Sequence, residues 1–367
     1  MRRRSRGWEL GRGLAALTVF TVSAWAQTPA QPQTAPQAKK PAPLTVDADP
    51  APSPDPDVAP SASAAATAGP KDVVKENGRY TLRENAYEVR LNASVIDGSG
   101  RTIDTLPQEA FHIYEDGVPQ TIASFRHEDL PVSLGILIDS SGSMYDKRPA
   151  VDAASINLVK LSNREDEAFL VDFSSEAYID TDFTSDIAKL QEGLGYVKSA
   201  GGTALYDAVI ASADYLSKNA KRPKQVLLIV TDGDDNASSA TLEQAIERVQ
   251  DLDGPAIYCI GLLFGEDTDR RESRHAREVL SELSAQTGGQ AYFPRSLKDV
   301  NGVAAEVAQD IRTQYTIAYR STKSPALGGY RQVHVEAKGK GFRGLQVRTR
   351  TGYFPKVAVP VASTTGQ

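Results

Sequence analysis

Residues 132–143 read Val-Ser-Leu-Gly-Ile-Leu-Ile-Asp-Ser-Ser-Gly-Ser. The first seven residues are mostly apolar without strict alternation, which is typical of a strand buried on both faces. Oxygen-bearing side chains and one glycine follow directly after it. A buried strand that ends in a polar loop is a building unit of parallel α/β sheets, and this stretch therefore predicts the class of the fold.

The same strand pattern recurs along the chain, with helical patterns between its copies. Further buried strands are predicted at 168–173, 226–230 and 256–262, and helices at 150–161, 204–216, 242–249 and 277–285. Strands and helices that alternate in this way form a Rossmann-like, mainly parallel sheet with helices on both faces. We assign residues 131–320 to this α/β domain.

Oxygen-bearing side chains collect at the ends of these elements. Asp139, Ser141 and Ser143 follow the first strand, Asp232 follows the strand at 226–230, and Thr203 precedes the helix at 204–216. Ligands of such sheets bind at the carboxyl ends of the strands, so we expect the five side chains to converge. Carboxylate and hydroxyl oxygens suit a hard cation, which predicts a site for Mg²⁺, with Mn²⁺ or Ca²⁺ as alternatives.

Only two of these five predicted ligands are anionic, so the ion would keep a position for water or for a partner's carboxylate. Each ligand also has a simpler interpretation when it is taken alone, because Asp, Ser or Thr before a helix commonly serves as its N-cap. The occurrence of all three segments in order, each at the appropriate end of its element, is what favours the metal site.

A calcium loop of the EF-hand type also fits part of this region. Its positions 1, 3, 5 and 12 would be Asp232, Asp234, Asn236 and Glu243. Position 6 should be Gly but is Ala237, and a strand precedes the loop where the motif needs a helix. We reject this motif and assign Asp234 and Asp235 to the surroundings of the site.

The motif Asp139-x-Ser141-x-Ser143, followed by Thr203 and by Asp232-Gly233, resembles the metal-ion-dependent adhesion site of von Willebrand factor type A domains. The resemblance covers residues 131–320. It implies that the serines and the threonine contact the cation directly, that the aspartates bind it directly or through water, and that an acidic group of a partner often completes the octahedron. Residues 80–125, with Phe-x-x-Tyr-Glu-Asp-Gly, resemble the leader of exported bacterial type A-related proteins.

The N-terminus is predicted to be a cleaved export signal at 1–26. Arginines precede an apolar stretch that ends in Ala-Trp-Ala. This stretch is shorter than the roughly 20 residues of a spanning helix, so no stable transmembrane segment is expected after cleavage. Residues 27–76 contain 11 of the 21 prolines and are predicted to be a disordered linker.

Alternating apolar residues on either side of the α/β domain predict β-structure. We expect an N-terminal β module at 77–130 and further strands at 321–356, which pack together as a small sandwich. Each part alone is near the lower size limit for independent folding. Residues 357–367 are predicted to be a frayed tail.

The composition narrows the class of function. The formal net charge of −6 argues against nucleic acid as the main partner. The sole cysteine, Cys259, excludes an internal disulfide.

The site and the signal predict a non-enzymatic, cation-dependent binding protein in the periplasm or at the cell surface, which engages a protein or surface ligand through a carboxylate. The alternatives are a metal-assisted hydrolase, for which we expect no His near the site loops, and a structural envelope component stabilised by its metal.

Overall fold

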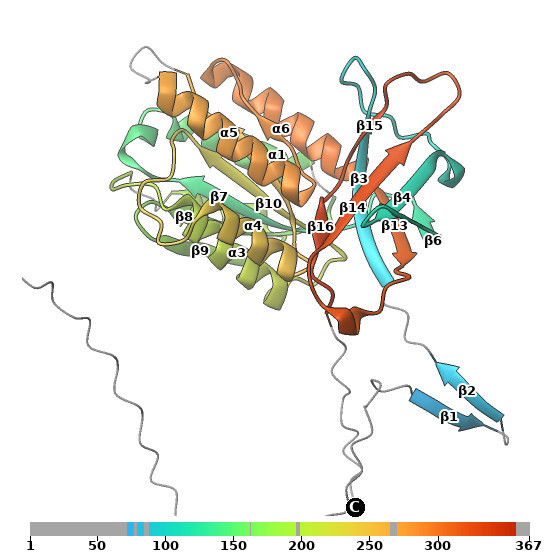
Figure 1. Cartoon of the computed structure of the whole chain (residues 1–367). Helices are drawn as coiled ribbons and strands as arrows, with labels where there is room; N and C mark the ends of the chain where they lie inside the picture. The colour runs from blue at the N-terminus through green and yellow to red at the C-terminus, as the bar shows by residue number, and fades with distance from the viewer. Residues whose placement is uncertain are drawn as a thin grey trace, which may run out of the picture. The chain divides into compact units, whose positions relative to one another are not determined.

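The computed structural model describes residues 88–161, 163–195, 199–264 and 270–356, together with the backbone of a hairpin at 72–83 without residues 77 and 78 (Figure 1). In this hairpin β1 (Asp72–Glu76) pairs antiparallel with β2 (Arg79–Arg83). Residues 72–76, at the end of the predicted linker, form the first strand of this hairpin. The predicted signal, the rest of the linker and the tail at 357–367 lie outside the described residues.

A six-stranded sheet forms the centre of the α/β domain. Its strand order is β12-β11-β10-β7-β8-β9. The strands are β7 (Val132–Asp139), β8 (Glu167–Phe173), β9 (Ala177–Thr184), β10 (Lys224–Thr231), β11 (Ala256–Gly261) and β12 (Ala291–Tyr292). Five of them run parallel, and only the edge strand β9 is antiparallel to its neighbour β8. The predicted mainly parallel α/β sheet is confirmed.

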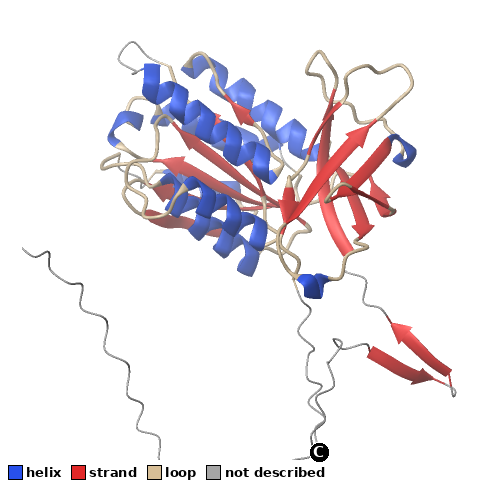
Figure 2. Ribbon diagram, viewed as in Figure 1, coloured by secondary structure: helices blue, strands red, loops and turns tan. Residues whose placement is uncertain are grey.

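Helices cover both faces of this sheet (Figure 2). They are α1 (Arg148–Leu161), α2 (Ile187–Leu194), α3 (Leu205–Asn219), α4 (Leu242–Asp251), α5 (Arg270–Thr287) and α6 (Leu297–Arg312). Leu134, Ile136 and Ile138 of β7 pack into one core with α1, α2 and α6, whereas Leu137 faces a second core with α3, α4 and α5. Side chains that point alternately into two cores explain why β7 is apolar on both faces. Among the described helices, none combines the length and apolar composition that crossing a membrane requires.

The remaining strands form two four-stranded sheets, each built from both ends of the described chain. Their orders are β15-β3-β13-β6 and β16-β14-β4-β5. The strands before the α/β domain are β3 (Glu88–Ile96), β4 (Phe111–Glu115), β5 (Val118–Gln120) and β6 (Ile122–Arg126). Those after it are β13 (Tyr315–Arg320), β14 (Arg331–Ala337), β15 (Gln346–Arg348) and β16 (Gly352–Tyr353). Three short 3₁₀ helices complete the described elements: η1 (Gln108–Ala110), η2 (Gly142–Met144) and η3 (Pro325–Leu327).

Strand β13 moves one predicted boundary. It falls within residues 131–320, yet it pairs with β3 and β6 and not with the central sheet. Tyr315, Ile317 and Tyr319 alternate into the core of the β-sandwich, where they are buried with residues of β3 and β4. This period of two places β13 in the sandwich, so the α/β domain ends before Tyr315.

A buried cluster of hydrogen bonds around Glu115 ties the two sandwich sheets together, because Glu115 belongs to the sheet of β4 and Tyr319 to the sheet of β13. Glu115 at the end of β4 accepts hydrogen bonds from Tyr319 (2.7 Å), Tyr353 (2.9 Å) and Ser321 (2.6 Å). Arg331 of β14 lies 3.3 Å from the same carboxylate, and both side chains of the pair are almost fully buried. We call these five residues the Glu115 cluster. It accounts for the Glu in the Phe-x-x-Tyr-Glu-Asp-Gly stretch, because four donors from late in the chain meet on that side chain.

Candidate metal centre

The first predicted ligand, Asp139, is the last residue of β7 and is fully buried. One carboxylate oxygen accepts a hydrogen bond from the backbone amide of Ser141 (2.8 Å), and the other accepts one from the hydroxyl of Thr231 (2.6 Å). Burial raises the pKa of Asp139 to about 6; these hydrogen bonds oppose the rise and the nearby charge of Asp232 adds to it. The site therefore holds two acidic groups that repel each other.

Hydroxyl groups connect Asp139 to Asp232. The hydroxyls of Ser141 and Ser143 lie 3.1 Å apart, and Ser143 donates to one carboxylate oxygen of Asp232 at 2.8 Å. The chain turns through η2 after Ser141, which brings the alternate side chains of this loop to one place. Because β10 lies directly beside β7, the loops after these two strands meet as the sequence predicts.

Thr203 comes from a third loop that is held against the other two. The amide of Ala200 donates to the carbonyl of Ser140 at 2.7 Å, and the amide of Thr203 donates to the side chain of Asn236 at 2.9 Å. A β-carbon placed on Gly233 would lie 3.7 Å from the Thr203 hydroxyl, so this hydroxyl faces the residue that follows Asp232. All five predicted ligands therefore lie along the carboxyl ends of neighbouring strands.

We call Asp139, Ser141, Ser143, Thr203 and Asp232 the edge cluster. Its donors are two carboxylates and three hydroxyls, which are the oxygen ligands that Mg²⁺, Mn²⁺ and Ca²⁺ prefer. Within the described residues no group of three or more His, Cys, Asp or Glu side chains gathers as a set of metal ligands. A cation here would take its remaining oxygens from the hydroxyls, from water or from a partner, and the donor set fits that kind of ion.

Lys147 is a member of the site that sequence reasoning missed. Its ammonium nitrogen lies 2.5 Å from the Asp232 oxygen that Ser143 does not bind. Its signal in the sequence was weak, because a lysine four residues after Ser143 indicates a contact with Asp232 only once β10 is known to lie beside β7. Thr231, the hydroxyl donor to Asp139, was missed for the same reason.

The loop after Asp232 brings a histidine close to the site, contrary to the sequence-based expectation. His275 of α5 lies 3.4 Å from a carboxylate oxygen of Asp234. The expectation that no His lies near these loops is therefore wrong, since the packing of α5 was not predictable from its spacing in sequence. Asp235 instead holds the loop, accepting from the amide of Tyr206 (3.1 Å) and the hydroxyl of Ser238 (2.5 Å).

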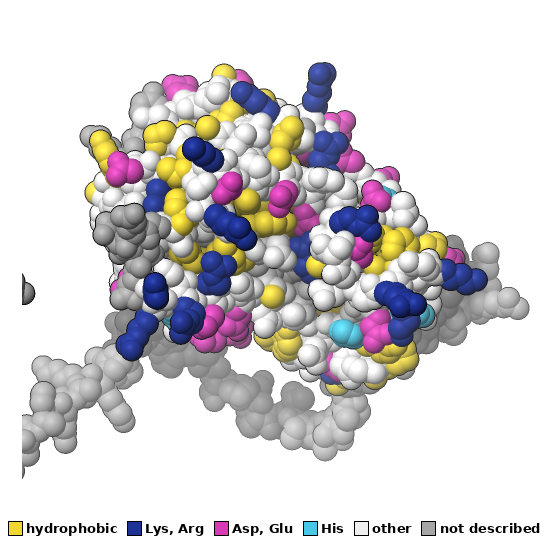
Figure 3. Space-filling view, turned by 90° about the horizontal axis from the view of Figure 1, so that it is seen from above, with side chains coloured by type: hydrophobic (Ala, Val, Ile, Leu, Met, Phe, Trp, Pro, Cys, Tyr) yellow, Lys and Arg dark blue, Asp and Glu magenta, His cyan; other side chains and the backbone are white. Residues whose placement is uncertain are grey.

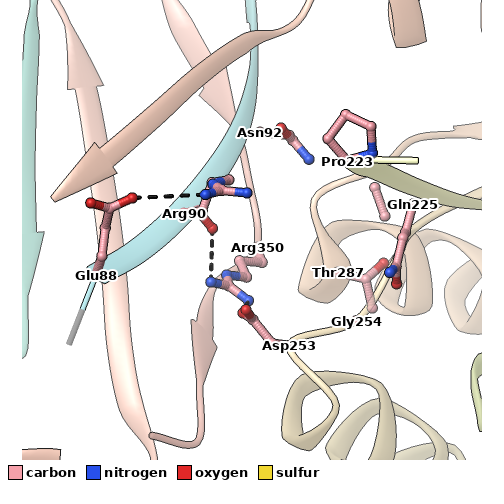
Figure 4. A pocket seen from close by; sticks show the side chains of 10 residues that line it. Glu88, Arg90, Asn92, Pro223, Gln225, Asp253, Gly254, Thr287 and Arg350 are labelled. Atoms are coloured by element: carbon pink, nitrogen blue, oxygen red, sulfur yellow. Dashed lines mark hydrogen bonds and ion pairs between the residues drawn. The ribbon is translucent and has the colours of Figure 1, made fainter. Parts of the chain in front are cut away.

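A separate pocket of about 370 Å³ lies at the amino ends of β10 and β11, where the α/β domain meets the sandwich. Arg350 lies between Asp253 and Arg90: it pairs with the Asp253 carboxylate and donates to the Arg90 carbonyl at 2.8 Å (Figure 4). Arg90 itself lies 3.8 Å from Glu88. Arg90 and Arg350 each have an acidic partner, so these pairs leave no unbalanced charge for a ligand. The pocket therefore lies at a junction between the α/β domain and the sandwich.

The surface carries charges of both signs. On the face shown in Figure 3, Lys and Arg side chains are scattered among Asp and Glu side chains. This face offers no continuous basic patch of the kind that phosphate backbones require.

Comparison with known proteins identifies the α/β domain. Residues 134–234 match the family model described as von Willebrand factor type A domain, a range that spans the whole edge cluster. No curated protein matches the chain.

Among solved structures the chain is similar to a von Willebrand factor type A protein from Catenulispora acidiphila, with 16% identity, a TM-score of 0.41 and coverage of 74% of this chain and 75% of that one. It is also similar to the vWF domain of the type V pili tip protein Mfa5 from Porphyromonas gingivalis, with 13% identity, a TM-score of 0.41 and coverage of 50% and 95%. The conserved hypothetical protein BatB from Bacteroides thetaiotaomicron matches with 16% identity, a TM-score of 0.38 and coverage of 49% and 98%. The assignment rests on the family match together with the strand order described above: the α/β domain of this chain is a von Willebrand factor type A domain.

Proposed function

We propose that this chain is an exported, cation-dependent interaction protein, in which the edge cluster holds one Mg²⁺ ion that coordinates an acidic group of a protein or surface ligand. The family match favours an interaction module. The observation that carries the proposal is the convergence of Asp139, Ser141, Ser143 and Asp232 through bonds of 2.8–3.1 Å at the sheet edge. The signal predicted at 1–26 supports export to the periplasm or the cell surface.

The carboxylates and the hydroxyls of the edge cluster would contribute differently to binding an ion. Two carboxylates contribute two negative charges, so a divalent ion bound there would retain its attraction for a further anion only through its open coordination position. The hydroxyls of Ser141, Ser143 and Thr203 bind without adding charge. Such a site favours a partner that brings its own carboxylate, because a carboxylate oxygen can fill the open coordination position of the ion.

The test is a binding assay with the full chain on immobilised envelope proteins of the source organism, in Mg²⁺ and in EDTA. We expect retention in Mg²⁺, release by EDTA and loss of retention in Asp139→Ala. Asp146→Ala is the matched control, since Asp146 is an exposed carboxylate of the same loop. Retention that is indifferent to both EDTA and Asp139→Ala would contradict the proposal.

The position of His275 favours a second candidate function, that of a metal-assisted hydrolase. A histidine paired with an aspartate has the form of a general base oriented by an acid, and Asp234 lies two residues beyond the proposed ligand Asp232. Generic ester and phosphate substrates, assayed with Mg²⁺ and Mn²⁺, test this candidate. Turnover that is lost in both His275→Ala and Asp232→Ala would favour the hydrolase over the interaction module.

A further inference from the structure

Asp232 is nearly enclosed, and both of its carboxylate oxygens are engaged. Its side chain is 1% exposed; Ser143 donates to one oxygen and the ammonium of Lys147 to the other. A buried carboxylate is costly unless a positive charge or several hydrogen-bond donors compensate it. Lys147 supplies that charge from within the protein.

The backbone holds Lys147 in this position. Its amide donates to the carbonyl of Met144 at 3.0 Å, and its own carbonyl accepts from the amides of Ala150 and Val151 at 3.1 and 3.2 Å. The residue therefore stands on the turn that leads from η2 into α1. The ammonium reaches Asp232 from a fixed base, and the side chain is only 20% exposed.

The placement of Lys147 runs against the usual electrostatics of a helix start. The amino end of a helix carries partial positive charge and favours acidic residues. Here Lys147 and Arg148 stand at the start of α1, and no acidic residue lies in its first turn. The helix does not explain these two cations, but the carboxylates that they contact do: Lys147 pairs with Asp232, and Arg148 pairs with Asp152 at 2.9 Å and with Asp172 at 3.4 Å.

We propose that the ammonium of Lys147 competes with the divalent cation for the Asp232 carboxylate and thereby sets the cation affinity of the edge cluster. The inference rests on the proposed function, because it concerns the same site. Two positive charges that share one carboxylate repel each other across a few ångströms. Lys147 thus weakens cation binding, and it neutralises Asp232 when the cation is scarce.

The experiment titrates the full chain with Mn²⁺ by calorimetry in wild type, Lys147→Met and Lys147→Gln. Lys189→Met is the control, because Lys189 is an exposed lysine of α2. We expect both Lys147 variants to bind Mn²⁺ about five- to tenfold more tightly than wild type, as the repulsion is removed. Lys147→Arg keeps the charge and should keep the affinity of the wild type.

Thermal unfolding supplies a second readout. In EDTA, Lys147→Met should melt about 2–4 °C below wild type, since Asp232 loses its partner, and saturating Mn²⁺ should remove that difference. Equal or weaker Mn²⁺ affinity in folded Lys147→Met and Lys147→Gln would overturn the inference while the wild type still binds. Absence of Mn²⁺ binding in the wild type and in all variants would overturn the proposed function with it.

Discussion

The edge cluster and the Glu115 cluster are both groups of polar side chains from distant parts of the chain, but their surroundings and their chemistry differ. In the Glu115 cluster every contact to the carboxylate is a proton donor, and the positive partner Arg331 is completely buried. In the edge cluster, hydroxyl oxygens stand between two carboxylates, and Ser143 is exposed. One carboxylate with a buried counter-charge stabilises the fold, whereas two carboxylates and three hydroxyls at a partly exposed sheet edge offer several oxygens to one ion.

Loss of the Glu115 cluster should lower the free energy of unfolding the most. Glu115→Gln removes the negative partner of Arg331, whose guanidinium then lies buried without a counter-charge. We expect the free energy of unfolding to fall by about 3–5 kcal/mol, with and without Mg²⁺. Urea denaturation measures this change. Glu109→Gln, at an exposed position before β4, is the control. An equally small loss of unfolding free energy in Glu115→Gln and Glu109→Gln would contradict a stabilising role of the Glu115 cluster.

The edge cluster should respond in the opposite way, with stability that depends on the ion. In wild type, Mg²⁺ at a hundredfold excess over its dissociation constant should raise the free energy of unfolding by about 3 kcal/mol. Asp139→Ala should abolish this gain, because the carboxylate at the end of β7 is removed. Thermal unfolding in Mg²⁺ and in EDTA measures the gain, and Asp146→Ala should retain it. An Mg²⁺-dependent rise that persists in Asp139→Ala would place the ion elsewhere.

Lys224 is a third case, a buried positive charge with no carboxylate at hydrogen-bonding distance among the described residues. Its ammonium donates to the carbonyl of Ile311 at the end of α6 (2.6 Å), and burial lowers its pKa to about 8. The folded state therefore releases this proton at a lower pH than the unfolded state does. Stability contributed by the group rises as pH increases from 8 toward the unfolded value of 10.5.

Relative to Lys224→Met, the wild type should gain about 2 kcal/mol between pH 8 and about 10. Chemical denaturation of both proteins across this range measures the difference in their free energies of unfolding. Titration of the tyrosines, which both proteins contain, cancels in this difference. A difference that is flat or falls with pH would show that the ammonium stays charged in the folded protein.

Substitutions where the α/β domain meets the sandwich should change the free energy of unfolding the least. Arg350→Met removes the pair with Asp253 and the bond to the Arg90 carbonyl, but Asp253 is 40% exposed and can be solvated. We expect a loss of about 1 kcal/mol in thermal unfolding. Arg101→Met breaks an ion pair whose arginine is 78% exposed and should cost less. A larger loss for Arg350→Met than for Glu115→Gln would reverse the ranking of the two regions.

Much of the α/β fold was predictable because its signals are local. The buried strands β7, β8, β10 and β11 are short apolar runs, and each predicted ligand stands directly beside the element that positions it. The edge strand β9 was missed because it is only partly buried and carries Asp180 and Asp182 within its length. Its pattern resembles that of a loop as much as that of a strand.

The parts that were not predicted depend on the order of strands in space. Lys147 contacts Asp232 only because β10 is inserted beside β7, and His275 reaches Asp234 only through the packing of α5. Glu115 likewise meets Tyr353 across 238 positions of sequence. The spacing of these residues in the sequence does not identify such pairs. A pattern of apolar and polar residues indicates which face of a helix or strand a residue occupies, but not which distant residue it contacts.

A crystal structure of the full chain grown with Mn²⁺, with the ion located by its anomalous scattering, tests whether the edge cluster binds a cation. We expect one peak within about 2.0–2.4 Å of the hydroxyl oxygens of Ser141, Ser143 and Thr203, with Asp139 and Asp232 bound directly or through water. A crystal saturated with Mn²⁺ that shows no peak among these five side chains, or that holds its ion elsewhere, would contradict this expectation.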